Sequence, residues 1–180
     1  MNKLIIFPTD TVYGIGAPLY DNKNIKKIYE IKGRSFNKQL PVLCSSIEQI
    51  NEFAILNDSA LKLAKAFWPG PLTLVLETKE KLFNFSGEKT IAVRIPNHKE
   101  TLKLISEVGP LKTTSVNKSN ETPLNDYDKI FERYNNKVDY IYKNKENSLG
   151  QASTIINLVD EIKVLREGGI TFDEIIKILK

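Results

Sequence analysis

The sequence is poor in the residues that many enzymes use for nucleophilic catalysis or metal binding. Its 180 residues include one cysteine, Cys44, and one histidine, His98. A single cysteine excludes an intrachain disulfide and a thiolate metal cluster, and a single histidine excludes a site built from several histidines. Because His98 follows Pro96 and Asn97 and precedes a predicted helix, we expect it to lie in an exposed loop.

Long apolar runs and glycine-rich phosphate signatures are also absent. No apolar stretch approaches the roughly 20 residues needed to span a bilayer, and only four apolar residues separate Lys3 from Pro8, too few for a signal-peptide core. With the low cysteine content, this predicts a cytoplasmic protein that does not enter membranes. The P-loop pattern does not occur, and Gly14 and Gly16 are followed by Leu19 where the dinucleotide fingerprint requires its third glycine. Phosphate binding in this chain therefore has to rely on side chains.

Length and composition indicate one globular domain with a mild basic charge. The hydrophobic content of 41% is ordinary for a globular protein, and we expect residues 1–180 to form a single domain. Lysine and arginine total 26 against 22 acidic residues, a net charge of +4. This excess suits anionic ligands or RNA and requires neither.

The apolar pattern predicts an α/β (α+β) fold, a twisted mixed sheet flanked by helices. Strand-like apolar runs alternate with segments whose apolar residues recur every three to four positions. The last two strand-like runs are close enough to form a hairpin, which favours a mixed sheet over a parallel one. The predicted strands are Leu4–Phe7, Leu40–Cys44, Leu72–Leu76, Thr90–Ile95, Leu111–Ser115, Val138–Tyr142, Ser153–Leu158 and Lys163–Glu167. The predicted helices are Asn24–Ile31, Ile47–Leu56, Ala60–Trp68, Lys99–Val108, Asp126–Tyr134 and a terminal helix capped by Thr171 and Glu174, and Lys118–Asn125 and Lys143–Gly150 are predicted polar loops.

The segment from Phe7 to Gly16 is the most informative in the chain. An apolar strand ends at Pro8, which fixes φ and cannot continue the ladder. Thr9, Asp10 and Thr11 follow and offer hydrogen-bond donors and acceptors. The segment is either a strand followed by a polar turn or the binding site of a polar ligand.

Cations and hydroxyls cluster at other predicted element ends. Lys32 and Arg34 flank a glycine at the end of the first predicted helix, and Lys38 follows. This is either a solvated basic helix end, favoured by the helix dipole, or a phosphate site. Arg94 lies within an apolar strand, where an unpaired guanidinium is costly. It therefore has either a structural ion pair or a bidentate ligand carboxylate.

Two further strand ends are rich in hydroxyls, at Thr113–Asn117 and at Ser153-Thr154, and Arg166 precedes a pair of glycines. Taken singly, each is a weak signal. Together they predict one concave site for a polyanion and a small zwitterion.

Seven segments occur in the order seen in the YrdC-like family, and the resemblance extends from Ile6 to about Gly169. They are Pro8–Gly14, Lys32–Lys38, Trp68–Thr73, Ala92–Pro96, Thr114–Asn117, Ser153-Thr154 and Leu165–Gly168. The resemblance implies a nucleotidyltransferase, threonylcarbamoyl-AMP synthase, which joins L-threonine, bicarbonate and ATP and releases pyrophosphate. Its product serves the threonylcarbamoylation of the adenosine next to the tRNA anticodon. The implied partners are the three substrates, the tRNA threonylcarbamoyl-transferase proteins and tRNA itself, and Mg²⁺ would accompany ATP.

The resemblance also implies roles for individual residues. The substrate supplies its own nucleophile, a carbamate formed from threonine and bicarbonate, so the protein has only to position groups and stabilise charge. The residues implied for phosphate contact and catalysis are Lys32, Arg34 and Lys38. Those implied for ATP binding are Arg34, Lys38, Thr90, Ser115, Asn117, Thr122 and Arg166. Those implied for threonine binding are Thr9, Thr11, Arg94, Thr113 and Ser153, and no side chain is implied as a metal ligand.

The chain departs from the family pattern in places, and two other functions are considered. Ser35 and Gln39 replace prolines, which predicts a more mobile loop, and Leu43 replaces a histidine present in many members. One alternative is a non-catalytic module that binds tRNA or double-stranded RNA. The other is a relative that handles carbamoyl-adenylate, as in hydrogenase-maturation proteins, and the single cysteine counts against it because those chains carry zinc fingers.

Overall fold

The computed structural model describes residues 3–119, 121–146 and 148–180 of the chain. The strands are β1 (Ile5–Phe7), β2 (Gly14–Pro18), β3 (Val42–Leu43), β4 (Leu72–Glu77), β5 (Thr90–Arg94), β6 (Leu111–Ser115), β7 (Tyr140–Ile141), β8 (Thr154–Asn157) and β9 (Lys163–Arg166). The helices are α1 (Asn22–Lys32), α2 (Ile47–Asn51), α3 (Asp58–Phe67), α4 (Glu80–Ser86), α5 (Lys99–Val108), α6 (Tyr127–Tyr134) and α7 (Phe172–Leu179).

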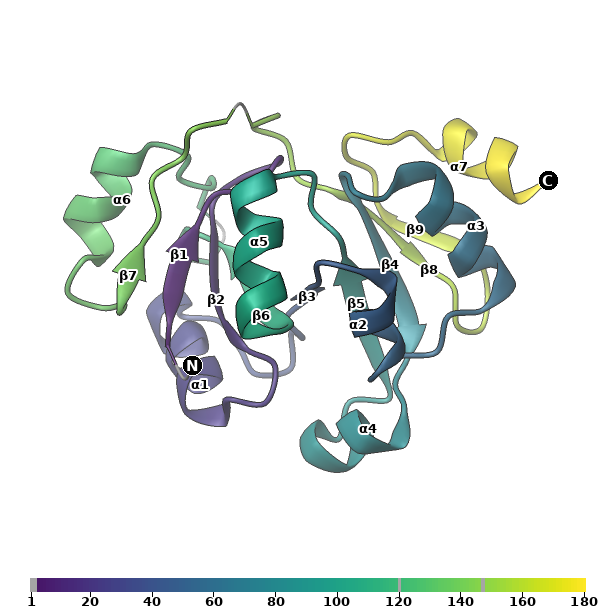
Figure 1. Cartoon of the computed structure of the whole chain (residues 1–180), viewed down its shortest axis with the longest axis horizontal. Coiled ribbons are helices and arrows are strands. Elements are labelled where there is room, and N and C mark those ends of the chain that lie inside the picture. The colour runs from purple at the N-terminus through teal and green to yellow at the C-terminus, as the bar shows by residue number, and fades with distance from the viewer. Residues whose placement is uncertain (1–2, 120, 147) are drawn as a thin grey trace.

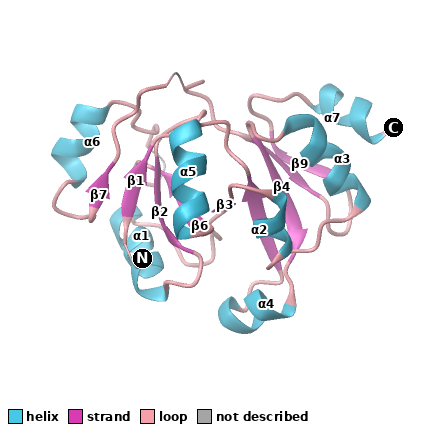
Figure 2. Cartoon of the chain, in the orientation of Figure 1, coloured by secondary structure: helices cyan, strands magenta, loops and turns pink. Residues whose placement is uncertain are grey.

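In the described residues, nine strands form one mixed sheet in the order β7-β1-β2-β6-β3-β5-β4-β8-β9, with helices around it (Figure 1; Figure 2). This confirms the predicted fold class. Strands β8 and β9 pair antiparallel, as the predicted hairpin requires, whereas β4 and β8 pair parallel. The middle strand, β3, is only two residues long, and it pairs parallel with β5 and antiparallel with β6.

Side chains along each strand point alternately to the two faces of the sheet, and helices pack on both faces. Phe7, Leu43 and Leu111 share one face and pack with buried residues of α5. On the other face, Ile6 and Ile15 pack with residues of α1 and α6. In the β5-β4-β8 half of the sheet, a third cluster packs with residues of α2, α3 and α7. The alternate positions of β4 and β5 carry Thr73 and Arg94, which belong to the candidate site.

Strand β2 and helix α4 were not predicted, and the predictions for the length of α2 and for the burial of His98 were wrong. Strand β2 has low strand propensity because it contains two glycines and a proline, but it pairs with β6 along its whole length and with β1 over Gly14–Gly16. Helix α4 has no side-chain cap at Lys79, so its sequence carries no start signal. The helix predicted over Ile47–Leu56 ends at Asn51. The predicted polar loops include Asn120 and Asn147, which lie outside the described residues.

The prediction for His98 was wrong in its burial. His98 is 1% exposed and caps α5, since its Nδ1 accepts from the Thr101 amide at 3.3 Å. Its Nε2 lies 3.1 Å from Asn144 Oδ1, in a segment far along the chain. The polar neighbours of His98 indicated exposure, but a cap and a distant partner satisfy both ring nitrogens.

Candidate functional site

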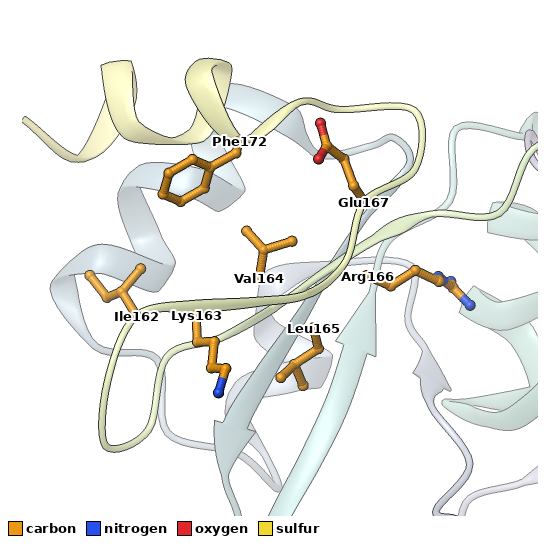
Figure 3. Close-up of a pocket in the computed structure, with 7 residues that line it drawn as sticks. All are labelled: Ile162, Lys163, Val164, Leu165, Arg166, Glu167 and Phe172. Carbon is orange, nitrogen blue, oxygen red and sulfur yellow. The ribbon is translucent and has the colours of Figure 1, made fainter.

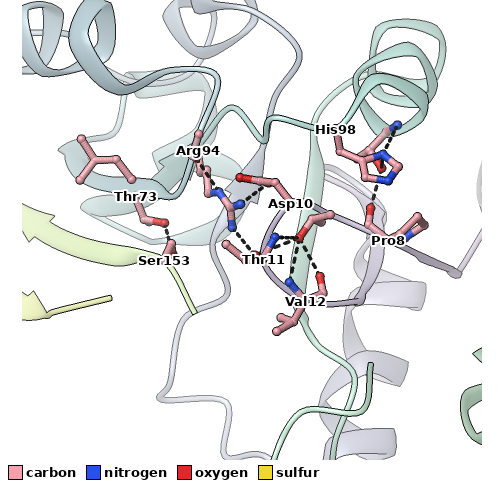
Figure 4. A network of polar contacts seen from close by, with 12 residues as sticks. Pro8, Asp10, Thr11, Val12, Thr73, Arg94, His98 and Ser153 are labelled. Atoms are coloured by element: carbon pink, nitrogen blue, oxygen red, sulfur yellow. Dashed lines mark hydrogen bonds and ion pairs between the residues drawn. The ribbon is translucent and has the colours of Figure 1, made fainter. Parts of the chain in front are cut away.

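The turn between β1 and β2 is fixed by its own hydroxyls. Thr9 Oγ1 accepts from the amides of Thr11 and Val12, each at 3.2 Å, and donates to the Val12 carbonyl at 2.7 Å. It also lies 2.9 Å from the Thr11 hydroxyl. Thr101 of α5 donates to the Pro8 carbonyl at 2.6 Å. These bonds leave Asp10 and Thr11 directed at the end of β5 (Figure 4).

Arg94, the last residue of β5, is 6% exposed and makes three contacts through three different nitrogens. Nε donates to the Gly70 carbonyl at 3.0 Å, Nη1 donates to Thr11 Oγ1 at 2.8 Å, and Nη2 forms an ion pair with Asp10 Oδ1. Burial lowers the pKa of Arg94 from its ordinary value, and the Asp10 carboxylate opposes this shift. The structural ion pair considered from the sequence is therefore present. Two of the five guanidinium N–H groups have no protein acceptor among the described residues.

The Gly70 carbonyl that meets Arg94 is held by a tight turn after α3. The Gly70 amide donates to the Ile95 carbonyl at 2.9 Å, which attaches the turn to the residue after β5. A Cβ atom at position 70 would lie 2.4 Å from the Phe67 carbonyl oxygen. Only glycine therefore fits here without displacing the backbone that accepts from Arg94.

A second hydroxyl pair lies on the neighbouring strands. Thr73 Oγ1 of β4 is 2.8 Å from the Oγ of Ser153, which directly precedes β8. Arg166 of β9 donates to the Ser153 carbonyl through Nε at 3.0 Å and through Nη2 at 2.8 Å. Two predicted site residues, Ser153 and Arg166, are thus joined. In the view of Figure 4, Arg94 lies between this pair and the Asp10–Thr11 turn.

The cationic group lies at the end of α1. Lys32 is 4% exposed, and its Nζ donates to the Ser115 carbonyl and to Asn117 Oδ1, each at 2.7 Å. Burial, aided by the nearby Arg34 charge, lowers the pKa of Lys32 from 10.5 to about 8. Ser115 Oγ in turn donates to Asn117 Oδ1 at 2.7 Å. Three predicted nucleotide-site residues therefore form one cluster at the end of β6.

Arg34 and Lys38 lie together in the loop after α1. Arg34 donates through Nε to the Lys38 carbonyl and through Nη2 to the Gln39 carbonyl, each at 3.1 Å. The Tyr29 hydroxyl also donates to the Lys38 carbonyl, at 3.2 Å. This backbone clamp gives the loop a defined shape although two family prolines are replaced. The Lys38 ammonium is exposed to solvent.

Three predicted site residues are not joined to these clusters by hydrogen bonds within the described parts of the chain. Thr113 donates to the Leu111 carbonyl at 3.0 Å and packs against Gly16, where an added Cβ would lie 2.8 Å from its hydroxyl. Thr90 is half-buried at the start of β5, and Thr122 is exposed in the loop after β6. Their predicted roles stay predictions.

The family model named Sua5_yciO_yrdC, described as "Telomere recombination", matches residues 1–168. The chain belongs to the Sua5/YciO/YrdC family. A relative from Pyrococcus abyssi, named threonylcarbamoyl-AMP synthase, is 38% identical over 98% of this chain and 54% of its own. A putative threonylcarbamoyl-AMP synthase from Methanocaldococcus jannaschii is 35% identical over 96% of this chain and 83% of its own.

A solved structure of this family shares the fold. The crystal structure of Pyrococcus abyssi Sua5 complexed with L-threonine matches with a TM-score of 0.89 and 38% identity, over 98% of this chain and 54% of that chain. The chain thus spans about half the length of the Pyrococcus abyssi relative. Escherichia coli YciO, with 22% identity and a TM-score of 0.86, shares the fold.

Sequence reasoning missed three residues of this candidate site. Asp10 stands in the most informative segment but received no role of its own. Thr73 is a hydroxyl inside an otherwise apolar predicted strand, a signal like that of Arg94. Gly70 stands in the Trp68–Thr73 segment, and nothing local shows that its carbonyl meets a residue 24 positions away.

A separate hollow is also present. A hollow of about 570 Å³ is lined by residues 162–167 and Phe172, and Figure 3 shows it between β9 and α7. Arg166 contributes to its wall, but its guanidinium donates to Ser153, on the side of the site. Within the described residues, no three or more His, Cys, Asp or Glu side chains gather as a metal site. No helix in the same residues is long and apolar enough to cross a membrane.

Proposed function

We propose that this chain is an L-threonylcarbamoyladenylate synthase, a nucleotidyltransferase that converts L-threonine, bicarbonate and ATP into threonylcarbamoyl-AMP and pyrophosphate. Relatives that carry this name support the proposal. The observation that carries it is the buried Arg94, which keeps two N–H groups free beside the Thr11 hydroxyl. A buried guanidinium with spare donors suits a small carboxylate ligand.

The amino acid binds, in this proposal, at the end of β5. The spare N–H groups of Arg94 take the threonine carboxylate, and the Thr11 and Ser153 hydroxyls orient the rest of the molecule. Thr9 contributes by holding the turn. Thr113 lies on the face of the sheet that carries Arg94 and contacts Gly16 of the neighbouring strand.

The nucleotide binds to the cationic group of Lys32, Arg34 and Lys38. Because the chain has no P-loop, these side chains replace the backbone amides that commonly hold phosphates. Ser115, Asn117, Thr90, Thr122 and Arg166 complete the proposed nucleotide contacts. Mg²⁺ enters with ATP as part of the substrate, coordinated by phosphate and water oxygens.

The proposed reaction depends on the positioning of the substrates and on the stabilisation of transition-state charge more than on acid–base catalysis by side chains. The threonine amine and bicarbonate form a carbamate and water. A carbamate oxygen then attacks the α-phosphorus of ATP, and the bond to the β-phosphate oxygen breaks to release pyrophosphate. Cations held on a defined loop stabilise the charge of that transition state. The product serves tRNA threonylcarbamoylation through transferase proteins, and we place the enzyme in the cytoplasm.

The test is pyrophosphate release from ATP with L-threonine and bicarbonate, each omitted in turn, and with serine in place of threonine. We expect release to require both co-substrates and to favour threonine. Arg34→Ala should abolish turnover, whereas Arg133→Ala, at an exposed arginine paired with Glu121, should not. Release that ignores threonine would refute the proposal, and salt-sensitive tRNA binding without turnover would favour the RNA-binding module.

A further inference from the structure

The carboxylate of Asp10 is only half satisfied. The residue is 8% exposed, and its Oδ1 forms the ion pair with Arg94. Its Oδ2 is buried and has no hydrogen-bond partner among residues 3–119, 121–146 and 148–180. A buried carboxylate oxygen without a donor is unfavourable, and native structures rarely retain one without a reason.

Within the described residues, no protein donor lies within hydrogen-bond distance of Oδ2. The nearest cation, Arg94, already uses Nε on Gly70 and Nη1 on Thr11. The Thr11 hydroxyl lies within reach of the Thr9 hydroxyl and accepts from Arg94. Asp10 thus offers one free acceptor beside an arginine that offers free donors.

A ligand that matches both has a carboxylate next to an N–H donor. An α-amino acid has this arrangement, because its carboxylate and its nitrogen share one carbon atom. We propose that Asp10 Oδ2 accepts a hydrogen bond from the α-nitrogen of the amino-acid substrate while Arg94 binds its carboxylate. This assignment rests on the proposed function and adds the group that recognises the nitrogen.

The contact is compatible with each form of the nitrogen along the reaction. The ammonium, the free amine and the carbamate each retain at least one N–H group. Asp10 can therefore hold the nitrogen in place before and after bicarbonate is added. A side chain that holds the nitrogen also fixes the direction in which the carbamate group extends from the α-carbon.

The competing role is purely structural, in which Asp10 only positions Arg94. Two ligands separate the roles: L-threonine, and the 3-hydroxybutanoate of matching configuration, which keeps the carboxylate and hydroxyl but has no nitrogen. Affinities of the wild type and Asp10→Asn for both are measured by ligand-observed NMR titration. Asp21→Asn is the control, because Asp21 is also 8% exposed but caps α1.

We expect Asp10→Asn to weaken L-threonine binding by about tenfold or more and 3-hydroxybutanoate binding by less than about twofold. Asp21→Asn should change neither. Equal losses for both ligands would overturn the inference and leave the proposed function standing. Failure of the folded wild type to bind L-threonine would overturn the proposed function and the inference with it.

A crystal structure of the wild type with L-threonine tests the contact without a variant. The α-nitrogen within about 3.2 Å of an Asp10 carboxylate oxygen supports the inference. A nitrogen that bonds only to other groups overturns it, whether or not Asp10→Asn folds.

Discussion

Arg94 donates to the Thr11 hydroxyl over 2.8 Å, although the two residues are 83 positions apart in the sequence. They also stand on opposite sides of β3 in the sheet, since Arg94 ends β5 and Thr11 lies between β1 and β2. This contact, which belongs to the proposed carboxylate site, therefore also joins the two halves of the sheet.

Arg94→Ala should raise the KM for threonine far more than the KM for ATP, because the spare N–H groups bind only the amino acid. The variant should also lose about 3–5 kcal/mol of unfolding free energy, since Asp10 is left as a buried, unpaired charge. Urea unfolding and initial-rate kinetics measure the two effects. Arg133→Ala, which breaks an exposed pair with Glu121, should cost less than about 1 kcal/mol. Equal increases in both KM values would remove Arg94 from the threonine site.

Lys32 should make stability rise with pH in an alkaline window. Its pKa is lowered from 10.5 to about 8 by burial and by Arg34, so between these values the unfolded chain holds a proton that the folded chain has released. The free energy of unfolding then increases with pH, and the cost of the buried charge is fully present below pH 8. Urea unfolding of wild type and Lys32→Met between these pH values isolates the effect, at no more than about 1.4 kcal/mol per pH unit. A constant difference between the two proteins would show that Lys32 has an ordinary pKa.

Gly70→Ala should disturb the site through the backbone. The added methyl group meets the Phe67 carbonyl oxygen at 2.4 Å, so the carbonyl that accepts from Arg94 has to move. We expect a loss of about 1–3 kcal/mol in stability and weaker threonine binding, measured by thermal unfolding and NMR titration. Gly169→Ala is the control, because its methyl group meets only side-chain atoms, of Pro71 at 3.3 Å and of Leu149 at 3.8 Å, among its nearest neighbours. If both variants bind threonine as the wild type does, the Gly70 carbonyl has no part in positioning Arg94.

Ser153 and Thr154 are neighbours with different expected roles. The Thr154 hydroxyl donates to the Ile170 carbonyl and accepts from the amides of Gly168 and Ile170, so Thr154→Val should reduce stability by about 1–3 kcal/mol. It should leave the KM for threonine unchanged. Ser153→Ala loses only the bonds of its hydroxyl with Thr73 and Arg166 and should mainly raise that KM. The reverse pattern would place the threonine site elsewhere.

The sequence was sufficient for the parts of the fold that local pattern controls. Every predicted strand and helix overlaps an element of the structure, because apolar alternation and helical spacing are local signals. Strand β2 escaped prediction because its pairing with β1 and β6, and not its composition, makes it a strand. His98 was misplaced for the same reason, since its partner Asn144 lies 46 positions away.

The sequence predicted which residues belong to the candidate site, but not which of them contact one another. The sequence showed that a buried Arg94 needs a partner, but only the fold selects Asp10, 84 positions away. The grouping of Lys32 with Ser115 and Asn117 likewise depends on where α1 ends relative to β6. The roles of all these residues stay predictions, and no hydrogen bond in the described residues joins Thr90, Thr113 or Thr122 to the clusters.

Strand β3 supplies only two residues at the middle of the sheet, so few backbone hydrogen bonds connect the two halves through it. Side-chain contacts also connect the two halves. Arg94 contacts Asp10 and Thr11 on the other side of β3, and Lys112 of β6 forms an ion pair with Glu88, just before β5. Arg94 is thus both the proposed carboxylate-binding residue and a structural link between the two halves of the sheet. A descendant of this chain in which Arg94 is replaced to accept another substrate would need other contacts to hold the two halves of the sheet together.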